Sequence, residues 1–279
     1  FGLYSSAEQS WIVTLTAGEI EAGHYQQMGL DRVEASRLKG SLRAWDSVSV
    51  PLWGGVPQER CIQLGYFCLQ LPVMQRAPAE PVASNDAQLG DTRYFRRFNP
   101  FALHSDVDGV PSWNNLLGDL HELIERIQPQ VIVLPHPRFD PHPDHLCSQQ
   151  AVLQALAATT WQPETLLYYA NHLHDNDRWP MGDAGTGVAL PPQITADEPL
   201  RPWTLGLSTE KQWHKAMSLG MMHDLQPRLP LKRLLRRVIQ RCLAARRWPV
   251  YGENEFFRKT VRRHELFWVQ ELSGKRENN

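Results

Sequence analysis

Short apolar runs alternate along the chain with segments whose apolar residues recur at helical spacing. Residues 11–16 are aromatic and β-branched, so they predict a strand, which ends at the glycine-containing turn 17–19. Apolar residues in 116–127 stand three or four positions apart, which predicts a helix that stops before Pro129. Residues 131–135 then form an uninterrupted apolar run, as in strands that are buried on both faces.

The same patterns give the other elements. Helices are expected at residues 31–45, 148–158 and 208–222, the last with Ser208 as its N-cap, and residues 1–9 are expected to end an earlier helix. Further strands are expected at residues 47–52 and 168–174, and long loops at 76–113 and 183–202. Strands that alternate with helices predict an α/β fold, with a mostly parallel sheet flanked by helices on both sides.

Composition narrows the class of protein. The 279 residues carry a net charge of -1, which gives no general attraction to nucleic acid. No run approaches the roughly 18 apolar residues of a membrane span. The four cysteines have no paired spacing, which argues against a disulfide framework and a thiolate zinc site. We therefore expect a cytoplasmic protein that can associate with a membrane.

The end of the chain differs in charge. Between Asp224 and Glu253 there is no acidic residue, whereas eight Lys and Arg residues are present, and Leu231, Leu234 and Val238 recur at helical intervals. Such a helix can lie on an anionic membrane, bind a phosphorylated glycan, or simply dock on the core with its basic face in solvent. We accordingly divide the chain into an α/β domain, residues 1–226, and a basic helix and tail, residues 227–279, that packs on it.

The densest group of reactive side chains follows the apolar run 131–135. Three histidines and two aspartates lie within ten residues and are separated by three prolines: His136, Asp140, His142, Asp144 and His145. Proline restricts the backbone, so this segment is expected to be a stiff loop that fixes the direction of its side chains. Loops at the carboxyl ends of parallel strands are where α/β proteins gather catalytic groups.

Metal binding is the simplest reason for this grouping. Neutral imidazole and carboxylate both suit zinc, and a catalytic zinc ion usually has three protein ligands and activates a water molecule. The loop thus predicts a divalent metal site, with zinc as the expected ion.

These residues resemble a known family, the LmbE-like zinc de-N-acetylases, which include N-acetylglucosaminyl-phosphatidylinositol de-N-acetylase (PIG-L). His-Pro-Asp-His at 142–145, after a Val-rich strand, is similar to the family's second signature. Residues 14–19 (Thr-Leu-Thr-Ala-Gly-Glu) are similar to its Thr-Asp-Gly-Glu strand end, and Arg32 and Glu34 to an Arg and a Glu on the next helix. Residues 215–226 are similar to its Lys-x-x-Ala-Leu segment with the following histidine.

The resemblance implies roles for individual residues and a Rossmann-like fold. It makes His145 a zinc ligand, and His142 the group that stabilises the oxyanion or protonates the leaving amine. It makes Asp144 the group that orients the His142 imidazole, and it gives Arg32 a part in substrate binding. The implied reaction is hydrolysis of the acetamide of an N-acetylated amino sugar in a glycolipid or glycoconjugate, including lipopolysaccharide intermediates.

The sequence departs from the family at two places. The first signature, Ala-His-Pro-Asp-Asp, which supplies two zinc ligands and the general base, has no match, and the chain enters the family pattern just after that point. We therefore expect the first strand and the remaining zinc ligands to lie upstream of Phe1, and residues 1–279 alone to bind zinc weakly and to be impaired or inactive. Residues 64–68 also lack the family's sugar-contacting Asp.

Two other functions remain open. One is a different metal-dependent hydrolase that uses the histidines and aspartates of the loop among themselves. The other is a non-catalytic module that binds a membrane surface or a glycan, with the loop as a relic of a metal site. For the substrate, Arg93, Arg96 and Arg97 together with the basic helix suggest an anionic amino-sugar conjugate.

Overall fold

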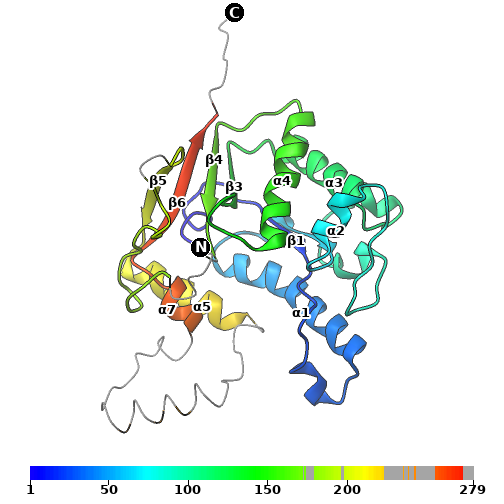
Figure 1. Ribbon diagram of the computed structural model, residues 1–279, viewed down its shortest axis with the longest axis horizontal. Coiled ribbons are helices and arrows are strands. Elements are labelled where there is room, and N and C mark those ends of the chain that lie inside the picture. The colour runs from blue at the N-terminus through cyan, green and yellow to red at the C-terminus, as the bar shows by residue number, and fades with distance from the viewer. Residues whose placement is uncertain are drawn as a thin grey trace, which may run out of the picture.

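The computed structural model describes an α/β protein whose strands form two sheets (Figure 1). It describes residues 1–171, 173, 179–195, 198–222 and 255–272, together with positions 235, 238 and 242. The strands are β1 (Ile12–Thr16), β2 (Cys61–Tyr66), β3 (Val131–Pro135), β4 (Thr165–Tyr169), β5 (Arg201–Gly206) and β6 (His264–Glu271). The α-helices are α1 (Arg32–Trp53), α2 (Leu71–Arg76), α3 (Trp113–Ile127), α4 (Pro143–Ala158), α5 (Thr209–Met221) and α7 (Glu255–Thr260). Short 3-10 turns are η1 (Tyr25–Met28), η2 (Gln58–Arg60), η3 (Thr92–Phe95) and η4 (His104–Val107).

The sheets are mixed rather than mostly parallel. β1 pairs with β2 in parallel, and β3 pairs with β4 in parallel. β6 then runs antiparallel to both β4 and β5, so the larger sheet has the order β3-β4-β6-β5. The sequence patterns had not predicted β2, β5 or β6. β6 comes from the end of the chain, and it places residues 264–271 inside the sheet of the main α/β unit.

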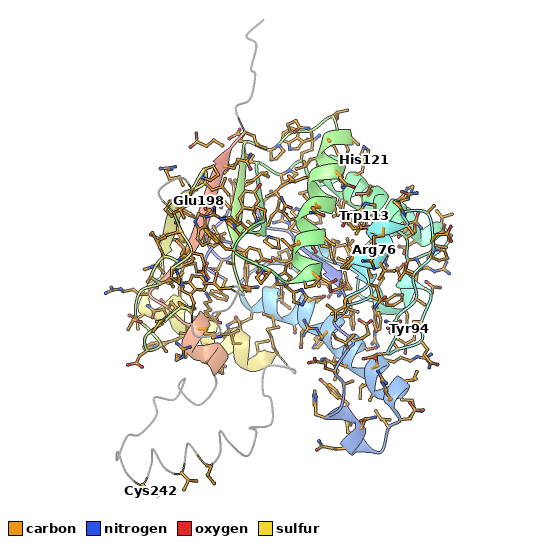
Figure 2. All side chains as sticks on the ribbon, viewed as in Figure 1. Arg76, Tyr94, Trp113, His121, Glu198 and Cys242 are labelled. Carbon is orange, nitrogen blue, oxygen red and sulfur yellow. The ribbon has the colours of Figure 1, made fainter. Side chains whose placement is uncertain are left out.

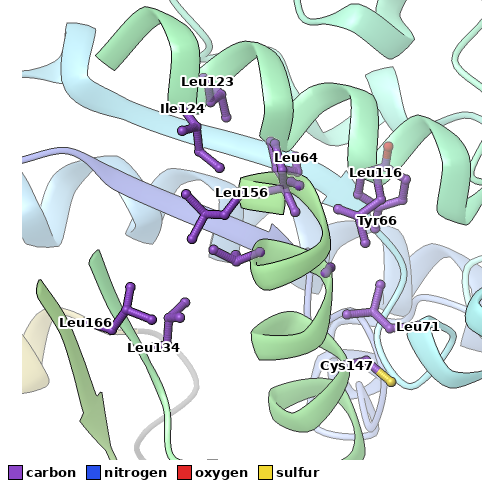
Figure 3. Close-up of a cluster of buried hydrophobic side chains, with 14 of the residues drawn as sticks. Leu64, Tyr66, Leu71, Leu116, Leu123, Ile124, Leu134, Cys147, Leu156 and Leu166 are labelled. Carbon is purple, nitrogen blue, oxygen red and sulfur yellow. The ribbon is translucent and has the colours of Figure 1, made fainter. Parts of the chain in front are cut away.

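Both sheets share one hydrophobic core. Leu64 of β2, Leu156 of α4 and Leu166 of β4 belong to the same buried cluster, and Figure 3 shows their side chains converging around α4. The predicted helix 116–127 is confirmed as α3, which is capped by Ser112 and buries its apolar face in this cluster. The two sheets are therefore parts of one packed unit.

Helix α1 overturns one predicted strand. Residues 47–52, expected as a strand, continue the helix that begins after Asp31, and the N-cap carboxylate of Asp31 accepts a hydrogen bond from the Glu34 amide at 2.8 Å. The alternation of Ser and Val in this stretch imitates a strand. However, Ala44, Val48 and Pro51 are buried at helical intervals, so packing of one helix face decides the conformation.

Three other boundaries also differ from the prediction. Residues 1–9 form turns rather than the end of a helix. β4 covers Thr165–Tyr169 instead of 168–174, and part of the predicted range lies outside the described residues. α4 starts at Pro143, five residues before the predicted start, with His142 as its N-cap residue. Proline is favoured at the first position of a helix because its missing N–H has no partner there in any case.

The two strands that begin the parallel pairs each have an open edge. Among the described residues β1 is hydrogen-bonded only to β2, and β3 only to β4. All five residues of β1 are only partly buried, whereas all six of β2 are buried. In β3, Val131 and Val133 are 47% and 41% exposed. Apolar strands of an α/β sheet are usually covered on both faces, so this exposure is unusual.

The long loop expected at residues 76–113 is confirmed between its flanking helices, whereas the loop expected at 183–202 overlaps β5, which begins at Arg201. Between α2 and α3, residues 77–112 contain no α-helix or strand, only η3 and η4. No helix within the described parts of the chain is long and apolar enough to cross a bilayer. The predicted basic helix of residues 227–247 lies outside the described residues, apart from single positions.

Candidate functional site

The predicted site residues lie where β3 ends and α4 begins. His136 directly follows β3, and Asp144 and His145 belong to the first turn of α4. The signature tetrapeptide 142–145 is thus the start of a helix rather than part of a free loop, which corrects the prediction of an irregular segment. This is the carboxyl end of a parallel strand, the edge of an α/β sheet at which ligands usually bind.

Asp140 and His145 form a buried carboxylate–imidazole pair. The Nδ1 atom of His145 lies 3.0 Å from Oδ2 of Asp140, whose side chain is fully buried. Burial would raise the pKa of Asp140, but the hydrogen bond and charge of His145, and the amides of Asn171 and His142, lower it below the usual value. An ionised Asp140 at this distance favours the tautomer of His145 that carries its proton on Nδ1, which leaves Nε2 as the nitrogen that can bind a metal ion.

Asp144 is a second buried carboxylate at the start of α4. Its Oδ2 accepts a hydrogen bond from the Leu69 amide at 2.7 Å, while its Oδ1 is buried without a hydrogen-bond partner. The helix N-terminus favours a negative charge at this position. Leu69 has a positive φ of 61°, so the turn after β2 is held in a conformation that aims its amide at the carboxylate.

His142 stands beside this pair. Its ring centroid is 4.6 Å from that of His145, and its backbone amide donates to Asp140 Oδ1 at 3.3 Å. Asp140 therefore contacts both the backbone of His142 and the ring of His145. The structure brings together the two histidines that the sequence placed in catalysis and metal binding.

His136 is set apart from the other histidines. Its side chain is 1% exposed, stacked on Phe139 at 4.2 Å and edge-on to Trp268 at 4.9 Å. The Nδ1 atom accepts hydrogen bonds from the amides of Arg138 and Phe139, both at 3.1 Å. Burial, aided by the charge of Arg138, lowers the pKa of His136 to about 4. These contacts are typical of a neutral histidine that braces the loop.

The carboxyl ends of β1 and β2 meet the start of α4. Glu19, which follows β1, is fully buried and accepts hydrogen bonds from the Cys68 amide at 3.1 Å and the Ser84 hydroxyl at 2.7 Å. Burial raises the pKa of Glu19, and the nearby charge of Asp144 raises it further. The sequence analysis did not single out Cys68. Only its position at the end of an unpredicted strand could have drawn attention to it.

Arg32 does not join this group in the structure. It lies in the first turn of α1, its side chain is 75% exposed, and it pairs with Asp86 of the 77–112 segment. The helix backbone places it away from Arg43, which approaches Gly18 at the carboxyl end of β1. Arg43 of α1 thus stands beside the turn that follows β1, as does Lys39, which donates to the carbonyl of Ile20.

Carboxylates of the protein pair with arginines of the 77–112 segment that were expected to bind an anion. Arg96 is buried and donates to Asp106 at 2.7 Å and to Asp119 at 2.9 Å. Arg93 is paired with Asp91 at 2.7 Å. Two of the three cations are thus neutralised by carboxylates of the protein. Arg96 also donates to the carbonyl of Leu64 in β2, so its role is to hold the loop on the sheet.

The described residues offer two donors of the types that zinc accepts. Among them, no three His, Cys, Asp or Glu side chains are arranged so that they could hold a metal ion. The two donors are the imidazole of His145, which lies against Asp140, and a buried carboxylate oxygen of Asp144 without a hydrogen-bond partner. They fit a zinc ion whose other ligands come from outside this set, and they give little support to a complete site made within the 136–145 segment.

Comparison with known proteins gives no independent assignment. No protein-family model matches the sequence, and no curated protein is significantly similar to it.

Proposed function

We propose that the protein is a zinc-dependent hydrolase that removes the acetyl group from an N-acetylated amino sugar, as in the LmbE-like de-N-acetylases. The observation that carries the proposal is the Asp140–His145 pair at the carboxyl end of β3. A carboxylate that fixes the tautomer of an imidazole is the usual second partner of a metal-binding histidine. A purely structural histidine would more often be enclosed, as His136 is.

Each residue has a role in this reaction. His145 would hold the zinc ion through Nε2, while Asp140 keeps its Nδ1 protonated. The zinc ion, when bound, supplies Lewis acidity that polarises the acetamide carbonyl and activates water. His142 would donate a proton to the leaving amine or a hydrogen bond to the developing oxyanion. Asp144 would orient the imidazole of His142, as the resemblance implies, while the Leu69 amide holds Asp144 itself in place.

The open strand edges support a Rossmann-like sheet that lacks one strand. In the doubly wound order 3-2-1-4-5, the first strand lies between the second and the fourth. If β1 to β4 are the second to fifth strands of such a sheet, omission of the first leaves the two parallel pairs β1–β2 and β3–β4. It also leaves β1 and β3 more exposed than the outer strand β2. We infer that the completing strand comes from sequence upstream of Phe1.

That strand would also complete the chemistry. Its carboxyl end would lie between Glu19 and the start of α4, where His145 and Asp144 already stand. Metal ligands and a general base carried there would reach the same point, since the carboxyl ends of parallel strands share one edge of the sheet. Residues 1–279 alone would then bind zinc weakly and hydrolyse poorly.

We propose the substrate class from the chemistry of the reaction and not from the shape of a binding pocket. An acetamide on a glycolipid or glycoconjugate sugar needs polarisation of a neutral amide, which is what a zinc ion supplies. With Arg93 and Arg96 paired within the protein, preference for an anionic conjugate depends on the basic segment at residues 228–247.

Metal content and deacetylation, measured on two polypeptides, test the proposal. One is residues 1–279, and the other carries the upstream coding sequence as well. We expect stoichiometric zinc, and release of acetate from an N-acetylglucosamine glycoside, only in the extended protein. Zinc in both would favour a different hydrolase with a site inside 136–145. Zinc in neither would favour the second candidate function, a membrane- or glycan-binding module.

A further inference from the structure

Helix α5 turns an apolar stripe toward solvent. Trp213 and Met217 are 58% and 56% exposed, and they lie one helical turn apart. Gly220 continues the same stripe and is also exposed. The buried residues of α5 are instead the small Ala216 and Ser218. A helix of a soluble domain normally reverses this arrangement, with large apolar groups inside.

The stripe continues across the end of α1. The indole Nε1 of Trp53 donates to the backbone carbonyl of His214 at 3.1 Å, and the two rings stack at 5.3 Å. Trp53 is 43% exposed and its neighbour Leu52 is 51% exposed. The end of α1 therefore contacts α5, and we call the exposed apolar side chains of these two helices, Leu52, Trp53, Trp213 and Met217, the α5 patch.

The charge of the chain indicates what covers this patch. Residues 225–252, which follow α5 in the sequence, contain eight Lys and Arg residues and no acid. The remainder of the chain therefore carries twenty-one basic and thirty acidic residues. An anionic surface would repel that remainder and attract residues 225–252. Tryptophan is also the side chain best suited to the boundary between water and lipid, because it combines a large apolar ring with a hydrogen-bond donor.

We propose that the α5 patch docks on the surface of an anionic lipid bilayer. Trp213 and Met217 insert among the lipids at the level of the headgroups, and Trp53 and Leu52 widen the contact. The basic stretch that follows α5 supplies electrostatic attraction, and the patch supplies the apolar part of the binding energy. This arrangement does not depend on the hydrolase proposal, since it uses no residue of the candidate site.

Vesicle sedimentation with the full 279-residue chain tests the proposal. The probes are phosphatidylcholine vesicles with and without phosphatidylserine. We expect binding only to the anionic vesicles, and about tenfold weaker binding for the double variant Trp213→Ser/Met217→Ser, because two large apolar side chains are lost from the contact.

A matched control removes one methionine and one aromatic side chain elsewhere. Met28 in η1 is 69% exposed and Tyr94 is 46% exposed. η1 precedes the opposite end of α1 from Trp53, about 33 Å away for 22 helical residues, and Tyr94 lies well away from α5 in Figure 2. Met28→Ser/Tyr94→Ser should bind as the unchanged protein does.

A second measurement does not depend on a polar substitution. Brominated phosphatidylserine vesicles should quench part of the tryptophan fluorescence, and Trp213→Phe should lose that part while its far-UV circular dichroism stays unchanged. Equal binding by all variants, or no binding to either vesicle, would overturn the proposal. So would a dimer that becomes monomeric in Trp213→Ser/Met217→Ser, since a second copy would then be what covers the patch.

Discussion

Titration of His136 should make the protein less stable as the pH falls below neutrality. The ring is 1% exposed, and Nδ1 accepts hydrogen bonds from the amides of Arg138 and Phe139. The neutral ring therefore carries its proton on Nε2, which is buried without a hydrogen-bond partner against the aromatic rings. Protonation of Nδ1 would remove the acceptor from two buried amides and place a charge among aromatic side chains. Both effects oppose the charged form in the folded state.

The sign and the size of this contribution to the free energy of unfolding follow from the pKa of His136 in the folded and unfolded states. The pKa of His136 is about 4 in the folded protein, against an ordinary value of 6.5. Between these values the unfolded chain binds the proton and the folded protein does not, so the free energy of unfolding rises with pH. The contribution is fully present above about pH 6.5, and it is lost as the pH falls toward 4. A shift of this size corresponds to about 3 kcal/mol.

Urea unfolding at half-unit steps from pH 4 to pH 8 measures this contribution. The informative control is His136→Asn, whose side-chain oxygen can still accept from the two amides but does not titrate. At pH 8 the variant should be less stable by about 1–3 kcal/mol because aromatic packing is lost. The difference in free energy of unfolding between the two proteins should shrink toward pH 4, because only the unchanged protein loses stability through its buried histidine. Two stability curves that run parallel from pH 4 to pH 7 would refute the reasoning.

Three further predictions concern the site and the loops around it. In the extended protein, His145→Ala should lose most of its zinc, whereas His142→Ala should lower turnover far more than zinc content; equal zinc loss would mean that their roles are reversed. Arg96→Met should lower the free energy of unfolding in urea by about 3–5 kcal/mol, because it leaves Asp119 buried without its partner, and a loss below 1 kcal/mol would contradict this. Gly65→Ala should cost at least about 1–3 kcal/mol in thermal unfolding, since Gly65 has φ 71° and a Cβ would lie 2.3 Å from a backbone carbonyl of η3; an unchanged melting temperature would exclude this strain.

Local patterns in the sequence predicted the elements that carry the candidate site. The apolar run 131–135 is β3 as predicted, the helix at 116–127 is α3, and Ser208 caps α5 through a hydrogen bond to the Lys211 amide. These features depend on residues only a few positions apart, so they can be predicted from the local sequence without knowledge of the fold. The position of His136, Asp140 and His142 after an apolar run was visible for the same reason, although that run is not buried on both faces as expected, because Val131 and Val133 are exposed.

Contacts between distant segments decided what the sequence left open. In the sequence, Asp140, His145 and His136 are equally good candidate metal ligands. Only packing shows that Asp140 pairs with His145, whereas His136 lies against Trp268. Likewise, the sequence suggests that Arg96 is a surface cation. In the structure it is buried and paired with Asp119, which lies twenty-three positions away in the sequence. The charge and the burial of a site residue are set by side chains that come from several helices, strands and loops. The sequence by itself therefore determined which groups are present, and only the tertiary structure decided which of them remain available for chemistry.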